Sequence, residues 1–124
     1  MIPKEYLEKL KSFAEQETRI VSLHIFGSEA TGRFGNRSDV DVAIMVRSEV
    51  DGSQRIRWER ELSVLLGKDV DVVVFNKATP LLQHQILKYG LLVHEKDPRE
   101  RVRQEVISRR HYLDTRSLYT LLEG

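Results

Sequence analysis

The sequence contains no cysteine, and this absence excludes disulfide bonds, thiol catalysis and zinc–cysteine sites. It also has little net charge, because 20 basic and 19 acidic residues give +1 at pH 7. The broad positive field of a nucleic-acid-binding protein is therefore missing, and we expect no direct nucleic-acid partner. Apolar runs such as 72–75 are far shorter than the ~18 residues of a membrane span, so we expect no membrane association. The first residues lack the apolar stretch of a signal peptide, which predicts a cytoplasmic protein.

What is present is an ordinary globular balance of 40% hydrophobic and 31% charged residues. A chain of 124 residues is long enough to bury a core of its own. We therefore expect residues 1–124 to form a single domain.

The hydrophobic pattern alternates between helical and strand periods along the chain. Strands are expected at 19–26, 39–46, 69–75 and 91–95. Helices are expected around 3–14, from a turn at 51–53 to about 66, at 80–89 after an N-cap at Thr79, and as a basic helix at about 98–122. A short helical turn and a loop are expected in the glycine-rich stretch 27–38. This order predicts an α/β (α+β) domain, in which helices pack on a small mixed sheet of about four strands.

Acidic residues at the predicted strands form the most informative pattern. Asp39 and Asp41 are two residues apart on one strand, so both carboxylates point to the same face. Two like charges at that spacing repel each other, and a divalent cation offsets the repulsion. Asp71 lies among valines on the next strand. If the two strands are neighbours, the three carboxylates can hold two Mg²⁺ ions about 3.5–4 Å apart.

Gly27 and Ser28 end the strand before this acidic pair. Glycine lets the backbone approach a phosphate group, and the N–H groups of a turn point at anions. The Ser28 hydroxyl adds another donor. Together with the carboxylates, these residues predict nucleotidyl transfer, in which a hydroxyl attacks the α-phosphorus of a triphosphate.

Gly27-Ser28 followed by Asp39-x-Asp41 resembles the signature of the DNA polymerase β-like nucleotidyltransferase superfamily. The strand carrying Asp71 and the Leu-Leu-x-x-x-Ile-Leu-x-x-Gly run ending at Gly90 are similar to the minimal nucleotidyltransferases. These are the MNT antitoxins, which are paired with HEPN-domain toxins. The resemblance covers roughly residues 23–95.

The resemblance implies a function for each matching residue. Asp39, Asp41 and Asp71 match the catalytic metal ligands, and Gly27 and Ser28 match the phosphate-binding pair. It implies transfer of AMP from ATP, with magnesium, to a tyrosine of a cognate HEPN toxin, so that the protein acts as an antitoxin. It also implies a polymerase β-like core for the fold.

The sequence departs from the family pattern at Glu29, where many relatives have a basic residue. A positive charge near the triphosphate is then missing unless Arg33 or Arg37 supplies it. Two other functions therefore stay open: nucleotidyl transfer to a small molecule such as an aminoglycoside, and binding of a toxin without catalysis. A homodimer and an assembly with toxin dimers also both stay open.

Simpler interpretations compete at several positions. Asp71 could instead form an ion pair with Lys68 or an arginine, and Asp69 could be the real ligand. His24 is interpreted as a hydrogen-bonded structural residue, and Trp58 as part of the core. The basic C-terminal helix is either a solvated face or a surface that docks a partner.

Overall fold

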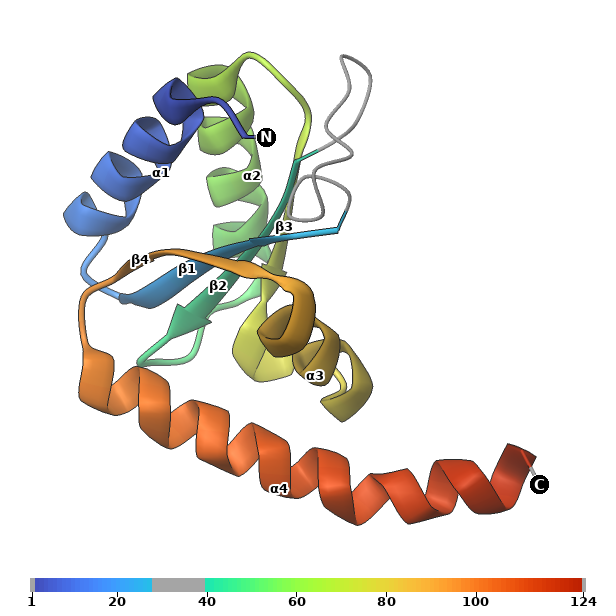
Figure 1. Ribbon diagram of the computed structural model, residues 1–124. Helices are drawn as coiled ribbons and strands as arrows, with labels where there is room; N and C mark the ends of the chain where they lie inside the picture. The colour runs from blue at the N-terminus through green and yellow to red at the C-terminus, as the bar shows by residue number, and fades with distance from the viewer. Residues whose placement is uncertain (1, 28–39, 124) are drawn as a thin grey trace.

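The computed structural model describes residues 2–27 and 40–123, which form a four-stranded sheet with helices on both faces (Figure 1). Its elements are α1 (Lys4–Gln16), β1 (Ile20–Phe26), β2 (Val40–Val46), α2 (Gly52–Leu66), β3 (Val70–Val74), the 3₁₀ turn η1 (Phe75–Lys77), α3 (Pro80–Tyr89), β4 (Leu91–Glu95) and α4 (Pro98–Glu123). The strand order is β3-β2-β1-β4. β1 is antiparallel to both β2 and β4, whereas β2 and β3 are parallel. The predicted α+β class and mixed sheet are confirmed.

The helices α1 and α2 cover one face of the sheet. Their apolar faces contribute Leu10, Phe13, Trp58 and Leu62 to the larger core cluster. Trp58 is 1% exposed and meets the Phe13 ring edge-on at a centroid distance of 6.4 Å, so its predicted place in the core is confirmed. This packing buries the side chains of β2 at positions 40, 42 and 44. The side chains at positions 41, 43 and 45 consequently point to the other face.

The second face carries a smaller core. It is built from Val21, Ala43, Met45, Phe75 and Ile86. Here α3 packs on the sheet and α4 packs on α3. The Ser108 hydroxyl of α4 donates a hydrogen bond of 2.9 Å to Gln83 Oε1 of α3, and both side chains are buried.

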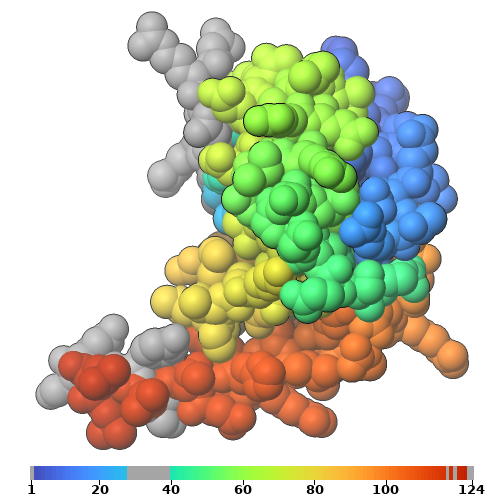
Figure 2. All heavy atoms as spheres, turned by 180° about the vertical axis from the view of Figure 1, so that it is seen from behind, coloured from blue at the N-terminus to red at the C-terminus, as the bar shows by residue number. Residues whose placement is uncertain are grey.

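Further contacts hold α3 against the sheet and α4 against α3. Gln83 Nε2 donates to the Phe75 carbonyl at 2.8 Å. The His84 and Tyr112 rings stack at a centroid distance of 3.7 Å with their planes almost parallel. Beyond this stack α4 continues past α3 and away from the body of the molecule, as both views show (Figure 1, Figure 2).

Two predicted boundaries are wrong, and each has a local cause. The stretch 51–53 is not a turn before a helix, because Asp51 itself caps α2 by accepting a hydrogen bond from the Gln54 N–H at 2.9 Å. Phe75 does not belong to the third strand. It opens η1, where its carbonyl accepts bonds from Ala78 N and from Gln83.

The other predicted elements agree with the structure to within a few residues. Thr79 caps α3 as expected, accepting from Leu82 N at 3.2 Å. The turn and loop expected at 27–38 lie, after Gly27, outside the described residues. Among the helices of the described ranges, none is both long enough and apolar enough to cross a membrane.

Candidate functional site

The end of β1 comes into close contact with the Asp41 side chain of β2. Gly27 follows β1 with φ +77°, a left-handed conformation that glycine adopts without strain. A Cβ atom at Gly27 would lie 2.5 Å from Asp41 Oδ2 and 3.4 Å from Asp41 Cγ. With the carboxylate in this position, a side chain at residue 27 would force it to move. The Gly27 backbone and the Asp41 carboxylate therefore lie against each other, and the phosphate binding expected at Gly27 stays a prediction.

The Asp41 and Asp71 side chains belong to adjacent positions of neighbouring strands. The two residues are direct partners in the parallel β2–β3 pair, flanked by the Val40–Val70 and Val42–Val72 pairs. Register partners in a parallel pair lie about 4.8 Å apart and point to the same face. Asp41 is half-buried and Asp71 is exposed, whereas the flanking valines are buried on the opposite face. The two carboxyl groups therefore share one accessible end of the sheet.

Two of the residues expected in this cluster, Ser28 and Asp39, lie outside the described residues, as do Glu29, Arg33 and Arg37. Within residues 2–27 and 40–123, no group of three or more histidine or acidic side chains is placed to hold a metal ion. A metal ion bound here would have Asp41 and Asp71 as two carboxylate ligands and would need a third from outside the described residues, for which Asp39 is the expected one. Carboxylate oxygens are the ligands that Mg²⁺ prefers. The described part of the cluster fits that ion.

Asp69 was the alternative to Asp71 in the sequence, and the register distinguishes them. Asp69 precedes β3, and its backbone carbonyl accepts a hydrogen bond from Val40 N at 3.0 Å. Asp71, not Asp69, is the register partner of Asp41. This placement favours Asp71 as the residue that acts together with Asp41.

His24 lies on β1 beneath α4 and is 5% exposed, in agreement with the structural position that we expected. Burial lowers the pKa of this imidazole, and the nearby Arg101 guanidinium lowers it further. Glu105 acts in the opposite direction and raises the pKa. The residue is buried and pairs with Ala43, two positions further into the sheet than Asp41, so we assign it no catalytic function.

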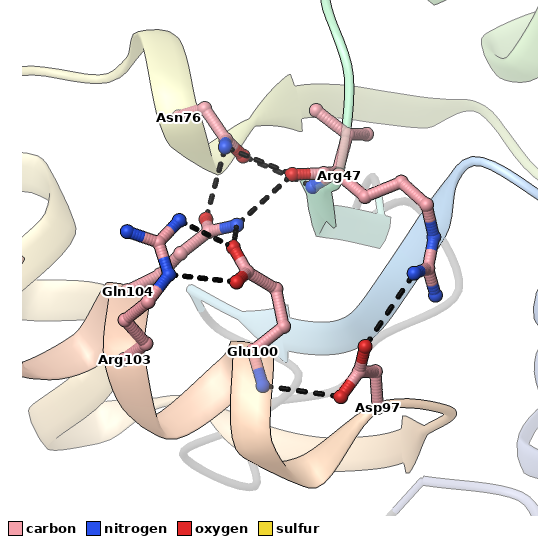
Figure 3. Close-up of polar contacts among 7 residues, drawn as sticks. Arg47, Asn76, Asp97, Glu100, Arg103 and Gln104 are labelled. Carbon is pink, nitrogen blue, oxygen red and sulfur yellow. Dashed lines mark hydrogen bonds and ion pairs between the residues drawn. The ribbon is translucent and has the colours of Figure 1, made fainter.

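A second polar cluster lies at the other end of β2 (Figure 3). Asn76 forms two hydrogen bonds of 3.0 Å with the backbone of Val46, one to its N–H and one to its carbonyl. Gln104 of α4 also donates to that carbonyl at 3.0 Å and accepts from Asn76 at 2.9 Å. The cluster fixes α4 to the end of the sheet.

Glu100 connects this cluster to charged side chains. It receives two hydrogen bonds of 2.7 Å from Arg103 and one of 2.7 Å from Gln104. These bonds lower the pKa of Glu100 to about 2. Together with Arg47 and Lys77, the residues line a cavity of about 440 Å³. The cavity is at the opposite end of β2 from Asp41, so we do not assign it to the candidate site.

The lowered pKa of Glu100 predicts a pH-dependent contribution to stability. The folded state holds a proton at Glu100 less readily than the unfolded chain, in which a pKa near 4.5 is ordinary. The contribution is complete above about pH 4.5 and is lost as the pH falls towards about 2. We expect a Glu100→Gln variant to be less stable than the wild type at pH 7, by about 0.2–1 kcal/mol because the pair is near the surface.

Urea denaturation of both proteins between pH 7 and pH 3 measures this effect, and the difference should shrink as the pH falls. The variant Glu61→Gln, which removes an exposed carboxylate of α2, controls for the loss of one negative charge. A difference between Glu100→Gln and wild type that stays constant over this range would contradict the prediction.

Sequence reasoning missed this second cluster entirely. Asn76 and Gln104 form no motif, because they contact each other across 28 residues and Gln104 reaches Val46 across 58. Asn and Gln residues gain such contacts only through the tertiary fold. The only local signal was the spacing of Glu100 with Arg103 and Gln104 on one helix, which does not show that the group joins the end of β2.

Comparison with known proteins gives a consistent result. A family model described as polymerase beta, nucleotidyltransferase matches residues 8–99. The protein adenylyltransferase MntA of Shewanella oneidensis is 26% identical over 81 residues, which are 65% of this chain and 58% of that protein. The match therefore spans less than two thirds of the length of that relative.

Solved structures show the same fold. One is a chain from the complex of a tri-AMPylated S. oneidensis HEPN toxin with an MNT antitoxin, which has a TM-score of 0.74 at 17% identity and covers 96% of this chain and 97% of that chain. Another comes from a toxin–antitoxin complex with AMP-PNP, with a TM-score of 0.71, 21% identity and coverage of 94% and 89%. At these identities the likeness concerns the fold alone.

Proposed function

This chain belongs to the polymerase β nucleotidyltransferase family, and from that premise we propose that it is a Mg²⁺-dependent protein adenylyltransferase. It transfers AMP from ATP to a tyrosine hydroxyl of a HEPN-domain toxin and thereby acts as an antitoxin. The observation that carries the proposal is the register of Asp41 with Asp71 beside the left-handed Gly27. Neighbouring carboxylates on one face can hold the metal ions that stabilise the attacking and leaving oxygens in phosphoryl transfer.

The residues have distinct functions in this proposal. Asp41 and Asp71, with Asp39, hold Mg²⁺, and Gly27 and Ser28 bind phosphate oxygens of ATP. When bound, the ion would neutralise negative charge on the phosphates. The absence of a Cβ at Gly27 keeps the Asp41 carboxylate at the position seen in the structure.

The transfer step balances as a substitution at the α-phosphorus. The tyrosine oxygen forms a bond to that phosphorus, and the bond from phosphorus to the bridging oxygen of the β-phosphate breaks. Pyrophosphate leaves, and AMP remains on the tyrosine. The hydroxyl proton passes to a carboxylate, and we assign this function to Asp71 because its exposed side chain is accessible to the hydroxyl of an incoming protein.

The relatives support a HEPN-domain protein as the acceptor. The matching curated protein is named a protein adenylyltransferase, and a chain of this fold is found in complex with an AMPylated HEPN toxin. AMP-PNP in a related complex supports ATP as the nucleotide. These facts describe other proteins, and they are the basis for proposing the same acceptor class here.

The test is incubation of this chain with ATP labelled on the α-phosphate, Mg²⁺ and its cognate HEPN-domain toxin. We expect label on a tyrosine of that protein, and none with the Asp39→Ala, Asp41→Ala double variant. Equal labelling by both proteins would overturn the proposal. If the double variant still protected cells from the toxin, neutralisation would occur by binding alone, which also overturns it.

A further inference from the structure

One face of α4 combines arginine with exposed aliphatic side chains. We call it the arginine face, and its members are Arg99, Val102, Val106, Arg109, Arg110, Leu113 and Arg116. At 100° per residue these positions fall within an arc of about 120°. Val102, Val106 and Leu113 run along the middle of this arc and are 48%, 39% and 60% exposed.

The opposite side of α4 is the one that packs on the molecule. Gln104 bonds to the Val46 carbonyl, Ser108 is 3% exposed and bonds to Gln83, and Tyr112 stacks on His84. These contacts orient the helix and turn the arginine face to the outside. Figure 2 shows α4 running along one side of the body and extending past it.

The charge on this face is of one sign. Glu100, Glu105 and Asp114 lie outside the arc, and the first two are paired with Arg103 and Arg101 of the same helix. Over the part of the chain that the structure describes, Arg99, Arg109, Arg110 and Arg116 form no ion pair. A strip of aliphatic side chains between cations is complementary to an apolar groove with an acidic rim.

We propose that the arginine face docks the acceptor protein through such a groove, an inference that rests on the proposed function. A protein is favoured over a nucleic acid because the centre of the face is Val102, Val106 and Leu113. Single-stranded nucleic acids are bound mainly by stacking bases on aromatic side chains, and although the face has arginines at its sides, none of its members is aromatic. Burial of aliphatic side chains in a protein groove, in contrast, contributes directly to affinity.

The arginine face of α4 and the candidate site at Asp41 are separate parts of the molecule. Gln104 of α4 contacts Val46 at the end of β2, five positions from Asp41, which is about 16 Å along an extended strand. The arginine face should therefore determine the affinity for the acceptor without contacting the nucleotide. Its substitution should raise the KM for the acceptor protein and leave the KM for ATP unchanged.

The test measures binding of the HEPN-domain protein to the full chain by calorimetry without ATP. We expect the Arg109→Glu, Arg116→Glu variant and the Val106→Glu, Leu113→Glu variant each to bind at least about tenfold more weakly than wild type. The matched control is Arg57→Glu, Arg60→Glu, which makes the same charge change on exposed positions of α2 and should bind like wild type. Circular dichroism of each variant verifies the fold.

Binding of both α4 variants at wild-type affinity, or no binding by the wild type, would overturn the docking surface. So would binding of a fluorescein-labelled single-stranded RNA that is lost only with the arginine substitutions while binding of the HEPN protein persists. Because the assay contains no ATP, it separates the two proposals. Weakened binding without any AMP transfer by wild type would support the docking surface and refute the proposed activity.

Discussion

An Asp41→Asn variant is expected to transfer AMP at least about 10²–10³-fold more slowly than wild type. Asparagine has nearly the same volume as aspartate but no negative charge, so it is a much weaker ligand for Mg²⁺. Asp71→Asn should show a loss of similar size, because Asp71 is the register partner of Asp41. Initial rates of label transfer at saturating ATP measure both effects, and thermal melting verifies that the variants fold.

Asp69→Asn is the matched control for these variants. It removes the same charge two residues earlier, at an exposed position that is not in register with Asp41. Its transfer rate should stay within a few-fold of wild type. A large loss of transfer rate with Asp69→Asn and none with Asp71→Asn would mean that Asp69, not Asp71, acts together with Asp41. Full activity of Asp41→Asn would remove the basis of the candidate site.

The strands that carry the candidate site were predictable because their signals are local. Runs of β-branched residues flank Asp41 and Asp71, and the period of two assigns each carboxylate to a face. The parallel pairing of β2 with β3 could be stated only as a condition, since no local pattern specifies which strands are neighbours. That pairing depends on α2, whose Trp58 and Leu62 pack on the opposite face of the same strands.

The exact ends of elements and the long-range polar contacts were less predictable. Asp51 was interpreted as a turn residue because Asp-Gly-Ser is common in turns, but Asp is equally a preferred N-cap, and the Gln54 N–H makes it one here. Phe75 has strong strand propensity, yet Gln83 binds its carbonyl and ends the strand. In both cases the boundary depends on a hydrogen bond to a later residue, Gln54 for Asp51 and Gln83 for Phe75.

A Gly27→Ala variant is expected to lose both stability and activity, for two separable reasons. The left-handed backbone at φ +77° costs alanine about 1–2 kcal/mol of folding free energy. In addition, the new Cβ would lie 2.5 Å from Asp41 Oδ2, so the carboxylate has to move. A displacement of a catalytic group by about 1 Å can cost about 10²-fold in rate, which is the loss of AMP transfer that we expect.

Gly67→Ala separates these two causes, because Gly67 has a similar φ of +68° but nothing within 4 Å of the position of its Cβ. It caps α2 at the far end from its Asp51 cap, with its N–H donating to the Ser63 carbonyl at 2.9 Å. We expect it to lose a similar 1–2 kcal/mol or so in urea denaturation while its transfer rate stays at the wild-type value. If both variants lost activity equally, backbone strain alone would explain the effect. If Gly27→Ala remained fully active, the contact between Gly27 and Asp41 would have no part in the chemistry.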